Sequence, residues 1–252
     1  MKPTLLIDGD VVAYKTSFLS EQPFHWGDDM WTLHCDFKEV TGRTYSFIED
    51  LKNELGAGDV IIALSHKENF RKKISPTYKA NRISMRKPVV LNQLKEYLIS
   101  AFKTEIWENA EADDVIGIMA TGEYKDRCIA VSIDKDFKTL PVKQYNPDKP
   151  EEGVRSVSNN EADYWFMYQT LTGDTTDGYP GCPGIGPKRA EGILGEIGQG
   201  SLPFYWECVK ACFKKAGFGE EEAIVQARLA RILRDGEYDK TTKTPFLWKP
   251  KS

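Results

Sequence analysis

Residues 4–10 read TLLIDGD, a short apolar run that ends in two aspartates, Asp8 and Asp10. A run of this kind, bounded by glycine and acidic residues, is typical of a buried β-strand. Comparable runs recur at residues 59–64, 104–107 and 128–133. Helical patterns lie between them, at about residues 36–55, 88–102 and 112–121. This alternation predicts an α/β fold with a mainly parallel central sheet flanked by helices.

The sequence pattern changes after about residue 156. The preceding segment, NPDKPEEG, is polar and proline-rich, as surface loops and linkers are. Helical patterns then occupy residues 159–172 and 220–234, with a glycine- and proline-rich segment between them. We therefore expect an α/β core over residues 1–156 and a helical region over residues 157–252.

The composition is that of a soluble globular protein. Hydrophobic residues make up 40% of the chain and charged residues 29%. No apolar run approaches the roughly 18 residues of a membrane span. The N-terminus has no signal-peptide pattern, and the five cysteines form no CxxC pair. We therefore expect a cytoplasmic protein with no membrane association, zinc site or disulfide framework.

Positive charge is concentrated in one segment. The net charge of −4 is unusual for a nucleic-acid binder, but residues 67–95 contain nine basic residues and one acidic residue. Phe70 and Tyr78 alternate with these cations, and aromatic rings can stack on unpaired bases while cations hold phosphates. A solvated charged face is the alternative. The candidate DNA contacts in this segment are Arg71, Lys72 and Tyr78.

Acidic residues form four separated clusters, each beside an apolar element. The clusters are Asp8 with Asp10, Glu111 with Asp113 and Asp114, Asp134 with Asp136, and Asp174 with Asp177. Acids at helix starts can be simple caps, and Asp10 in particular can be one. In a parallel sheet, however, ligands bind beyond the carboxyl ends of the strands, where Asp8 and Asp134 are expected. Four such clusters favour one shared site.

Carboxylates that converge in one cleft repel each other unless cations separate them. Ligands that are all oxygen favour Mg²⁺ or Mn²⁺ over zinc. Two such ions about 4 Å apart can activate water and stabilise the leaving oxygen of a phosphodiester. The three histidines, His25, His34 and His66, show no metal-ligand spacing. The clusters therefore predict a nuclease that uses two Mg²⁺ ions, with Mn²⁺ as the alternative.

A glycine-rich turn, PGCPGIGPKRA, follows the last acidic cluster. Glycines such as Gly184 and Gly186 let the backbone approach a ligand closely, and Pro187 suits the first turn of a following helix. The free N–H groups of that turn, together with Lys188 and Arg189, can hold a phosphate. A plain surface loop is the alternative.

The order of these motifs resembles the flap endonuclease/5′→3′ exonuclease superfamily, and within it the 5′ exonucleases of podophages. The matching segments are LLIDGD, FRKKISPTYKANR, EADDVIG, SIDKDFKTL, GDTTDGYPGCPGIGPKRA and ARLARILR. They cover nearly the whole chain. The resemblance implies a PIN-like 5′-nuclease core with a basic arch at about residues 67–95. It also implies a C-terminal DNA-binding region with a helix–three-turn–helix element.

The resemblance also implies a role for each matched residue. The first metal would be held by Asp8, Glu111, Asp113 and Asp114. The second would be held by Asp134, Asp136 and Asp177, with Asp174 nearby. Lys79 and Arg82 would be the catalytic cations of the arch, beside the scissile phosphate. The turn at residues 181–190 would grip the duplex backbone, and in this family it often binds a potassium ion.

The implied activity is metal-dependent hydrolysis of DNA at free 5′ ends and flaps, in phage DNA replication or host DNA degradation. RNA/DNA hybrids are a further expected substrate, and a monomer in the host cytoplasm is expected. One position departs from the family, because His66 or its neighbour Ser65 stands where an aspartate is usual. Two alternatives stay open. One is a haloacid-dehalogenase-like phosphatase that uses Asp8 and Asp10, and the other is a catalytically silent, structure-specific DNA-binding protein.

Overall fold

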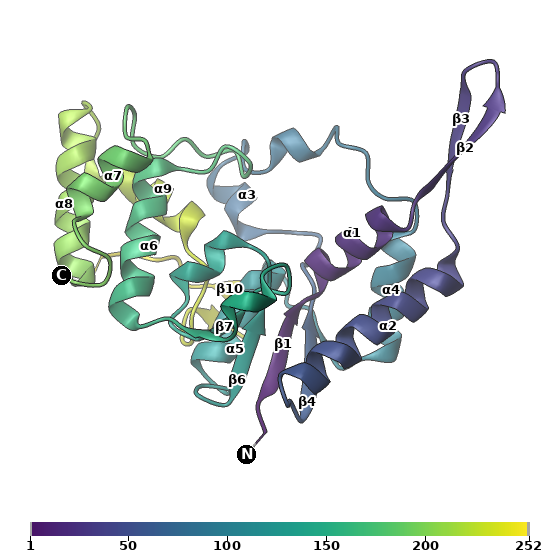
Figure 1. Ribbon diagram of the computed structural model, residues 1–252. Helices are drawn as coiled ribbons and strands as arrows, with labels where there is room; N and C mark the ends of the chain where they lie inside the picture. The colour runs from purple at the N-terminus through teal and green to yellow at the C-terminus, as the bar shows by residue number, and fades with distance from the viewer. Residues whose placement is uncertain (1, 251–252) are drawn as a thin grey trace.

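The computed structural model describes residues 2–250, which form an α/β region and an adjoining helical region (Figure 1). The strands of the main sheet are β1 (Thr4–Asp8), β4 (Asp59–Ala63), β5 (Thr104–Glu105), β6 (Cys128–Val131), β7 (Lys143–Tyr145) and β8 (Arg155–Ser156). Their order is β5-β4-β1-β6-β7-β8. Pairing is parallel from β5 to β7, and β8 runs antiparallel to β7. The predicted mainly parallel sheet is therefore confirmed.

Helices cover both faces of this sheet because alternate strand residues point to opposite sides. Leu5 and Ile7 pack against α1 (Gly9–Leu19), α2 (Phe37–Glu54) and α4 (Leu91–Ala101) on one face. Leu6 packs against α5 (Ala112–Thr121) on the other face. Helices α2, α4 and α5 were predicted, whereas α1 was not.

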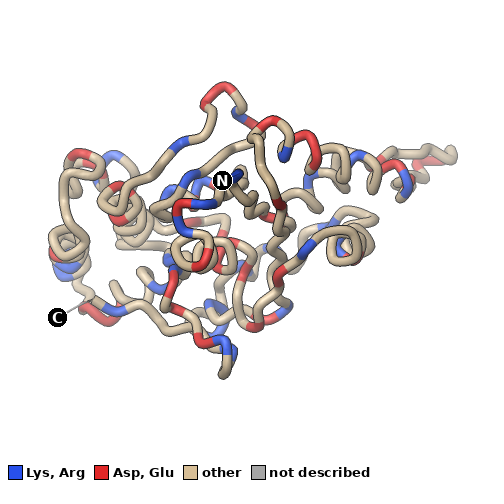
Figure 2. Tube along the Cα trace, turned by 90° about the horizontal axis from the view of Figure 1, so that it is seen from below, with Lys and Arg blue, Asp and Glu red and all other residues tan. Residues whose placement is uncertain are grey.

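The helical region consists of α6 (Asn159–Thr172), α7 (Pro187–Leu194), α8 (Leu202–Lys215) and α9 (Glu220–Ala230). These helices enclose a core of their own, rich in aromatic residues such as Tyr164, Phe166 and Trp206. Among residues 2–250, no helix is both long enough and apolar enough to cross a bilayer. Acidic and basic positions are interleaved along the trace (Figure 2).

The predicted basic arch is a mostly irregular segment between β4 and α4. It contains the short helix α3 (Phe70–Ile74) and the single turn η1 (Ala80–Arg82). In Figure 1 it runs across the top of the molecule from α3 towards α4. The remaining short elements are η2 (Lys135–Thr139), η3 (Pro150–Glu152), β9 (Tyr238–Asp239) and β10 (Thr244–Pro245).

Two features differ from expectation. A hairpin of β2 (Gln22–Gly27) and β3 (Met30–His34) projects away from the body of the protein (Figure 1). In addition, the helix predicted over residues 220–234 ends at Ala230. The chain then becomes extended and crosses α5, where the Leu233 N–H donates to Asp114 Oδ1 at 3.1 Å. This tertiary contact replaces the last helical turn.

Candidate metal centre

Asp8 lies at the end of β1, where its carboxylate caps α1 by accepting the Val11 N–H at 3.1 Å. Its other oxygen accepts the Ser132 hydroxyl at 3.2 Å. Ser132 follows β6, the neighbour of β1, and its hydroxyl oxygen accepts the Asp134 N–H at 3.1 Å. The adjacent strands therefore bring Asp8 and Asp134 to the same edge of the sheet.

Asp134 and Asp136 flank Lys135 at the start of η2. Asp134 caps this turn by accepting the Asp136 N–H at 2.9 Å. The Asp136 carboxylate accepts a hydrogen bond from the side-chain amide of Gln169 on α6. The helical region therefore contributes directly to the acidic cluster.

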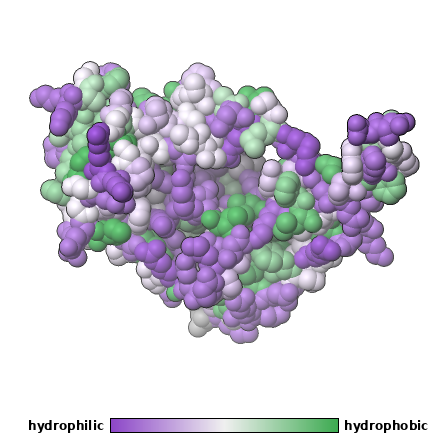
Figure 3. Space-filling model, turned by 45° about the horizontal axis from the view of Figure 1, so that its top comes forward, coloured by the Kyte–Doolittle hydropathy of each residue, from purple (hydrophilic) through white to green (hydrophobic). Residues whose placement is uncertain are grey.

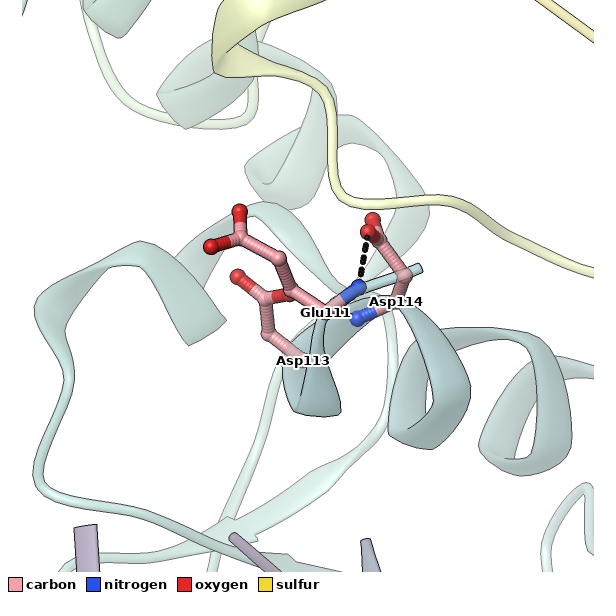
Figure 4. Close-up of side chains that lie close together, drawn as sticks. All are labelled: Glu111, Asp113 and Asp114. Carbon is pink, nitrogen blue, oxygen red and sulfur yellow. Dashed lines mark hydrogen bonds between the residues drawn. The ribbon is translucent and has the colours of Figure 1, made fainter. Parts of the chain in front are cut away.

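Glu111, Asp113 and Asp114 begin helix α5. One oxygen of each lies within 4.8 Å of the others, close enough for a shared cation (Figure 4). The carboxylates of Glu111 and Asp113 point to one side, whereas Asp114 turns back to accept the Glu111 N–H at 3.0 Å. The three acids are therefore not equivalent.

Asp114 is fully buried, and both of its oxygens are engaged by protein donors. Arg71 donates to both of them at 2.7 Å, and the N–H groups of Glu111 and Leu233 complete the set. The resemblance assigned Asp114 to the first metal. The contacts instead make it a buried support for the site, because both of its oxygens are paired with the buried Arg71 guanidinium.

Arg71 was predicted to contact DNA, and this prediction is wrong. The residue is only 1% exposed. Besides Asp114, its guanidinium donates to Glu111 at 3.1 Å and to the carbonyls of Leu229 and Arg231 at 3.1 and 2.6 Å. Arg71 therefore joins α5 to the end of α9 inside the protein.

Tyr78 was also predicted to contact DNA, and it too is buried, with 3% exposure. Its hydroxyl lies 2.8 Å from Glu111 Oε2 and 3.1 Å from Asp177 Oδ2. The ring is therefore not available to stack on a base. By contrast, Lys72 on α3 is exposed.

The two predicted arch cations lie among the carboxylates. Lys79 Nζ forms an ion pair with Glu111 Oε1 and lies 3.6 Å from Asp177 Oδ2. Arg82 forms an ion pair with Asp177 Oδ1. The Lys79 N–H also donates to the Asp177 carbonyl at 2.7 Å, so the arch is attached to the 174–178 turn by its backbone.

Asp174 orders this turn, because its Oδ1 accepts the N–H groups of Thr176 and Asp177 at 2.7 and 3.2 Å. Its other oxygen pairs with Lys135 at 2.7 Å. Sequence reasoning missed Lys135, Ser132 and Gln169 as members of the site. For Lys135 the signal was present, since it lies between two of the predicted ligands.

Burial and mutual repulsion leave several of these acids short of compensating charge. Burial and the charge of Asp10 raise the pKa of Asp8 to about 7. Burial and the charge of Asp134 raise the pKa of Asp136 to about 7 as well. Burial and neighbouring acids also raise the pKa of Asp113. Divalent cations would relieve this repulsion, and a donor set made of carboxylate oxygens fits Mg²⁺ or Mn²⁺.

Glu111 behaves in the opposite way. Although burial opposes its ionisation, Lys79 and Arg71 hold the pKa of Glu111 at about 2. The cluster therefore has one part compensated by protein cations and another part, around Asp8, Asp113 and Asp136, that is not.

The position that departs from the family does not supply a carboxylate. His66 Nδ1 accepts from the N–H groups of Glu68 and Asn109 at 3.2 and 3.4 Å, which leaves only Nε2 for a metal. Ser65 Oγ accepts the Ala112 N–H at 3.0 Å. Asp10, the second acid of the phosphatase alternative, pairs with Lys95 at 2.5 Å.

The glycine-rich turn lies away from this cluster, at the start of α7. Gly184 has φ +77°, and its carbonyl accepts from Arg189 Nη1 at 2.6 Å. Gly186 precedes Pro187 without a side-chain cap. Pro187 has no N–H, and the Arg189 N–H donates to the Gly186 carbonyl at 3.1 Å. Gly184, Gly186, Lys188 and Arg189 are all exposed.

Carboxylates gathered at the carboxyl edge of a parallel sheet, with basic side chains among them, define a metal-dependent nuclease of the α/β class. The chain belongs to the 5′–3′ exonuclease family, because residues 3–161 match the N-terminal resolvase-like domain of that family. The superfamily resemblance is therefore confirmed, and neither the phosphatase nor the silent binding protein is supported.

Named relatives agree with this assignment. The chain is 30% identical over 292 residues to the exodeoxyribonuclease of Enterobacteria phage T3, covering 100% of this chain and 94% of the relative. It is 32% identical over 213 residues to the flap endonuclease Xni of Vibrio campbellii, covering 76% and 77%. The bacteriophage T5 flap endonuclease, in a complex with DNA and metal ions, shares the fold. That likeness has a TM-score of 0.62 at 19% identity, over 90% of this chain and 88% of the T5 chain.

Proposed function

We propose that this protein is a 5′ nuclease that hydrolyses DNA phosphodiesters with two divalent cations, Mg²⁺ by preference and Mn²⁺ as a substitute. The charge balance of the acidic cluster carries this proposal. Its eight carboxylates are Asp8, Glu111, Asp113, Asp114, Asp134, Asp136, Asp174 and Asp177. Within residues 2–250, four cations contact them: Arg71, Lys79, Arg82 and Lys135. When all ionise, four negative charges remain, which two divalent cations would balance.

The proposed ligands fall into two groups. Asp8, Glu111 and Asp113 would hold one ion, and Asp134, Asp136 and Asp177, with Asp174 beside them, would hold the other. Bound in this way, the ions would supply an activated water and a charge for the leaving oxygen. The chain itself orients the acids through Ser132, Gln169 and Arg71.

Lys79 and Arg82 are the proposed catalytic cations. They line a cleft beside Glu111 together with three further basic residues of the arch, Lys67, Lys72 and Lys87. The face that carries the arch is hollowed in the middle, and hydrophilic residues as well as a hydrophobic patch border the hollow (Figure 3). Such a cleft suits the phosphate beside the bond to be cut, since cations already held in place can stabilise the charge that develops there.

The turn at Gly184 and Gly186, with Lys188 and Arg189, is the proposed grip on duplex backbone. A helix start without a side-chain cap and two exposed cations support phosphate binding without sequence preference. A potassium ion held by carbonyls of this turn is part of the same proposal, drawn from the family. Lys72 is the proposed DNA contact on α3.

Relatives named exodeoxyribonuclease and flap endonuclease support DNA with free 5′ ends or flaps as the substrate. We extend the proposal to RNA/DNA hybrids. The protein would act as a monomer in the host cytoplasm, in phage DNA replication or host DNA degradation. The arch would lie over an α/β core of residues 1–156, and residues 157–252 would carry the helix–three-turn–helix element.

The test is digestion of duplex and flapped DNA labelled at the 5′ or the 3′ end, with Mg²⁺ and with EDTA. We expect products released from 5′ ends and from flaps, and no cleavage in EDTA. Early release of 3′ label as mononucleotides would refute the polarity. Cleavage that persists in EDTA would refute the metal site.

A further inference from the structure

The two oxygens of Glu111 have different kinds of partner. Oε2 faces Arg71 at 3.1 Å and the Tyr78 hydroxyl at 2.8 Å, and both partners are buried. Oε1 contacts Lys79, whose side chain keeps 19% of its surface exposed. A lysine ammonium on a flexible stem can leave such a contact, whereas a buried guanidinium held by five bonds cannot easily do so. Only the partner of Oε1 can therefore be exchanged for another cation.

Asp177 is arranged differently. Its Oδ1 pairs with Arg82, whose side chain is 45% exposed, and its Oδ2 lies 3.6 Å from Lys79 Nζ and 3.1 Å from the Tyr78 hydroxyl. That hydroxyl has a single proton and lies closer to Glu111 Oε2, at 2.8 Å. The Lys79 ammonium thus stands between an acid at the start of α5 and an acid in the 174–178 turn. This is where the proposed function places metal ligands.

The base of the arch is held by contacts that do not involve these charges. The Lys79 N–H donates to the Asp177 carbonyl at 2.7 Å, and the Thr77 hydroxyl donates to the Gly178 carbonyl at 3.3 Å. Gly178 has φ +76°, and a Cβ there would lie 2.5 Å from the Thr77 carbonyl oxygen. The backbone at Lys79 is therefore fixed even when its ammonium moves.

We propose that the Lys79 ammonium is the resident counter-ion of Glu111 and Asp177, and that a divalent cation must displace it to reach Glu111 Oε1 and Asp177 Oδ2. This inference rests on the proposed function, because it takes both acids as metal ligands. An ammonium and a divalent cation cannot share these oxygens, since like charges a few ångströms apart repel strongly in a partly buried site.

Displacement of the Lys79 ammonium is local, and it determines what Lys79 does before and after DNA binds. The ammonium swings away from the carboxylates while its backbone stays docked on the 174–178 turn. It therefore remains near the metal and becomes available to an anionic oxygen of the substrate. Lys79 competes with the metal before DNA binds and assists it afterwards.

Metal binding by the DNA-free protein separates these roles. We would measure Mn²⁺ binding at about pH 8, from the electron paramagnetic resonance signal of the free ion, for wild type, Lys79→Ala and Lys79→Gln. Both variants should bind Mn²⁺ at least fivefold more tightly than wild type while cleaving DNA more slowly. Lys79→Arg, which keeps the charge, should stay within about twofold of wild-type affinity.

Lys72→Ala is the matched control for metal affinity, because it removes the same charge from the same arch at an exposed position. Its Mn²⁺ affinity should change by less than twofold. If Lys72→Ala and Lys79→Ala increased the Mn²⁺ affinity equally, the cause would be the overall positive charge of the arch. That result would overturn the inference. Unchanged or weaker binding by both Lys79 variants would overturn it as well.

Hydrogen exchange tests the local nature of the displacement. The Lys79 amide should stay protected when Mn²⁺ is added, because its bond to the Asp177 carbonyl persists. Loss of that protection would mean that the whole arch detaches, against the inference.

The outcomes also separate this inference from the proposed function. If wild type binds Mn²⁺ and cleaves DNA but the Lys79 variants do not bind Mn²⁺ more tightly, the inference alone fails. If wild type neither binds Mn²⁺ nor cleaves DNA, the proposed function fails with it.

Discussion

Arg71→Ala tests whether this residue belongs to the interior or to the DNA surface. The guanidinium donates to both oxygens of Asp114 at 2.7 Å and is 1% exposed. Its removal would leave a fully buried carboxylate without a cation. Breaking a buried ion pair in this way costs about 3–5 kcal/mol. That is a large share of the roughly 5–15 kcal/mol that stabilises a typical domain.

The assay is urea unfolding of the metal-free protein, followed by circular dichroism. Arg43→Ala is the control, because its ion pair with Glu39 lies on the exposed surface of α2 and should contribute less than about 1 kcal/mol. Arg71→Met combined with Asp114→Asn should be more stable than Arg71→Met alone, since the orphaned charge is gone while the amide oxygen can still accept a backbone N–H. If Arg71→Ala cost less than about 1 kcal/mol and weakened DNA binding instead, the interior role would be refuted.

Three further predictions concern the acids and His66. Asp134→Ala and Asp136→Ala should each abolish cleavage and leave DNA binding largely intact; near-normal turnover would remove these residues from the site. Burial and the charge of Asp10 raise the pKa of Asp8 to about 7 in the folded, metal-free protein, whereas its pKa in the unfolded chain is about 3.9. The free energy of unfolding should therefore fall as pH rises from about 4 to about 7. Asp8→Asn should flatten the decrease in metal-free Tm over that range, and an unchanged slope would contradict the raised pKa. His66→Asp should preserve or improve Mg²⁺-supported cleavage, because it adds a carboxylate beside the first metal; a large loss would show that this position does not match the family's aspartate.

Most of the main sheet could be predicted from the sequence because its strands are buried on both faces. Such strands appear as continuous apolar runs, and this is why β1, β4 and β6 were found. The β2–β3 hairpin has no buried face, since nearly every residue in both strands is exposed. It therefore leaves no alternation of buried and exposed residues to detect. Helix α1 was missed because its buried positions include Gly9 and Ser17, which weaken the apolar pattern.

The site was predicted as a set of acids. The sequence could not separate the proposed metal ligands from buried residues that hold the ligands in place. Arg71 and Lys72 are neighbours of equal charge, yet one is buried and the other exposed. Arg71 is buried because it bonds to Asp114, 43 residues away in sequence, and to the carbonyls of Leu229 and Arg231 beyond it. No local pattern reports a partner at that separation. Lys79 and Arg82 were assigned from the family motif, and the structure places both beside Glu111 or Asp177.

The extended segment after α9 has a consequence for how the protein can be divided. Residues 229–233 supply two acceptors to Arg71 and one donor to Asp114, so they complete the interior of the catalytic half from the far end of the chain. A fragment cut near residue 156 would keep Asp8, Glu111, Asp113, Asp134 and Asp136 but lose Asp174 and Asp177. It would also lose the backbone groups that satisfy this buried pair. The catalytic half is thus not a transplantable module. A chimaera with another 5′ nuclease would have to carry α3, α5 and the segment after α9 together.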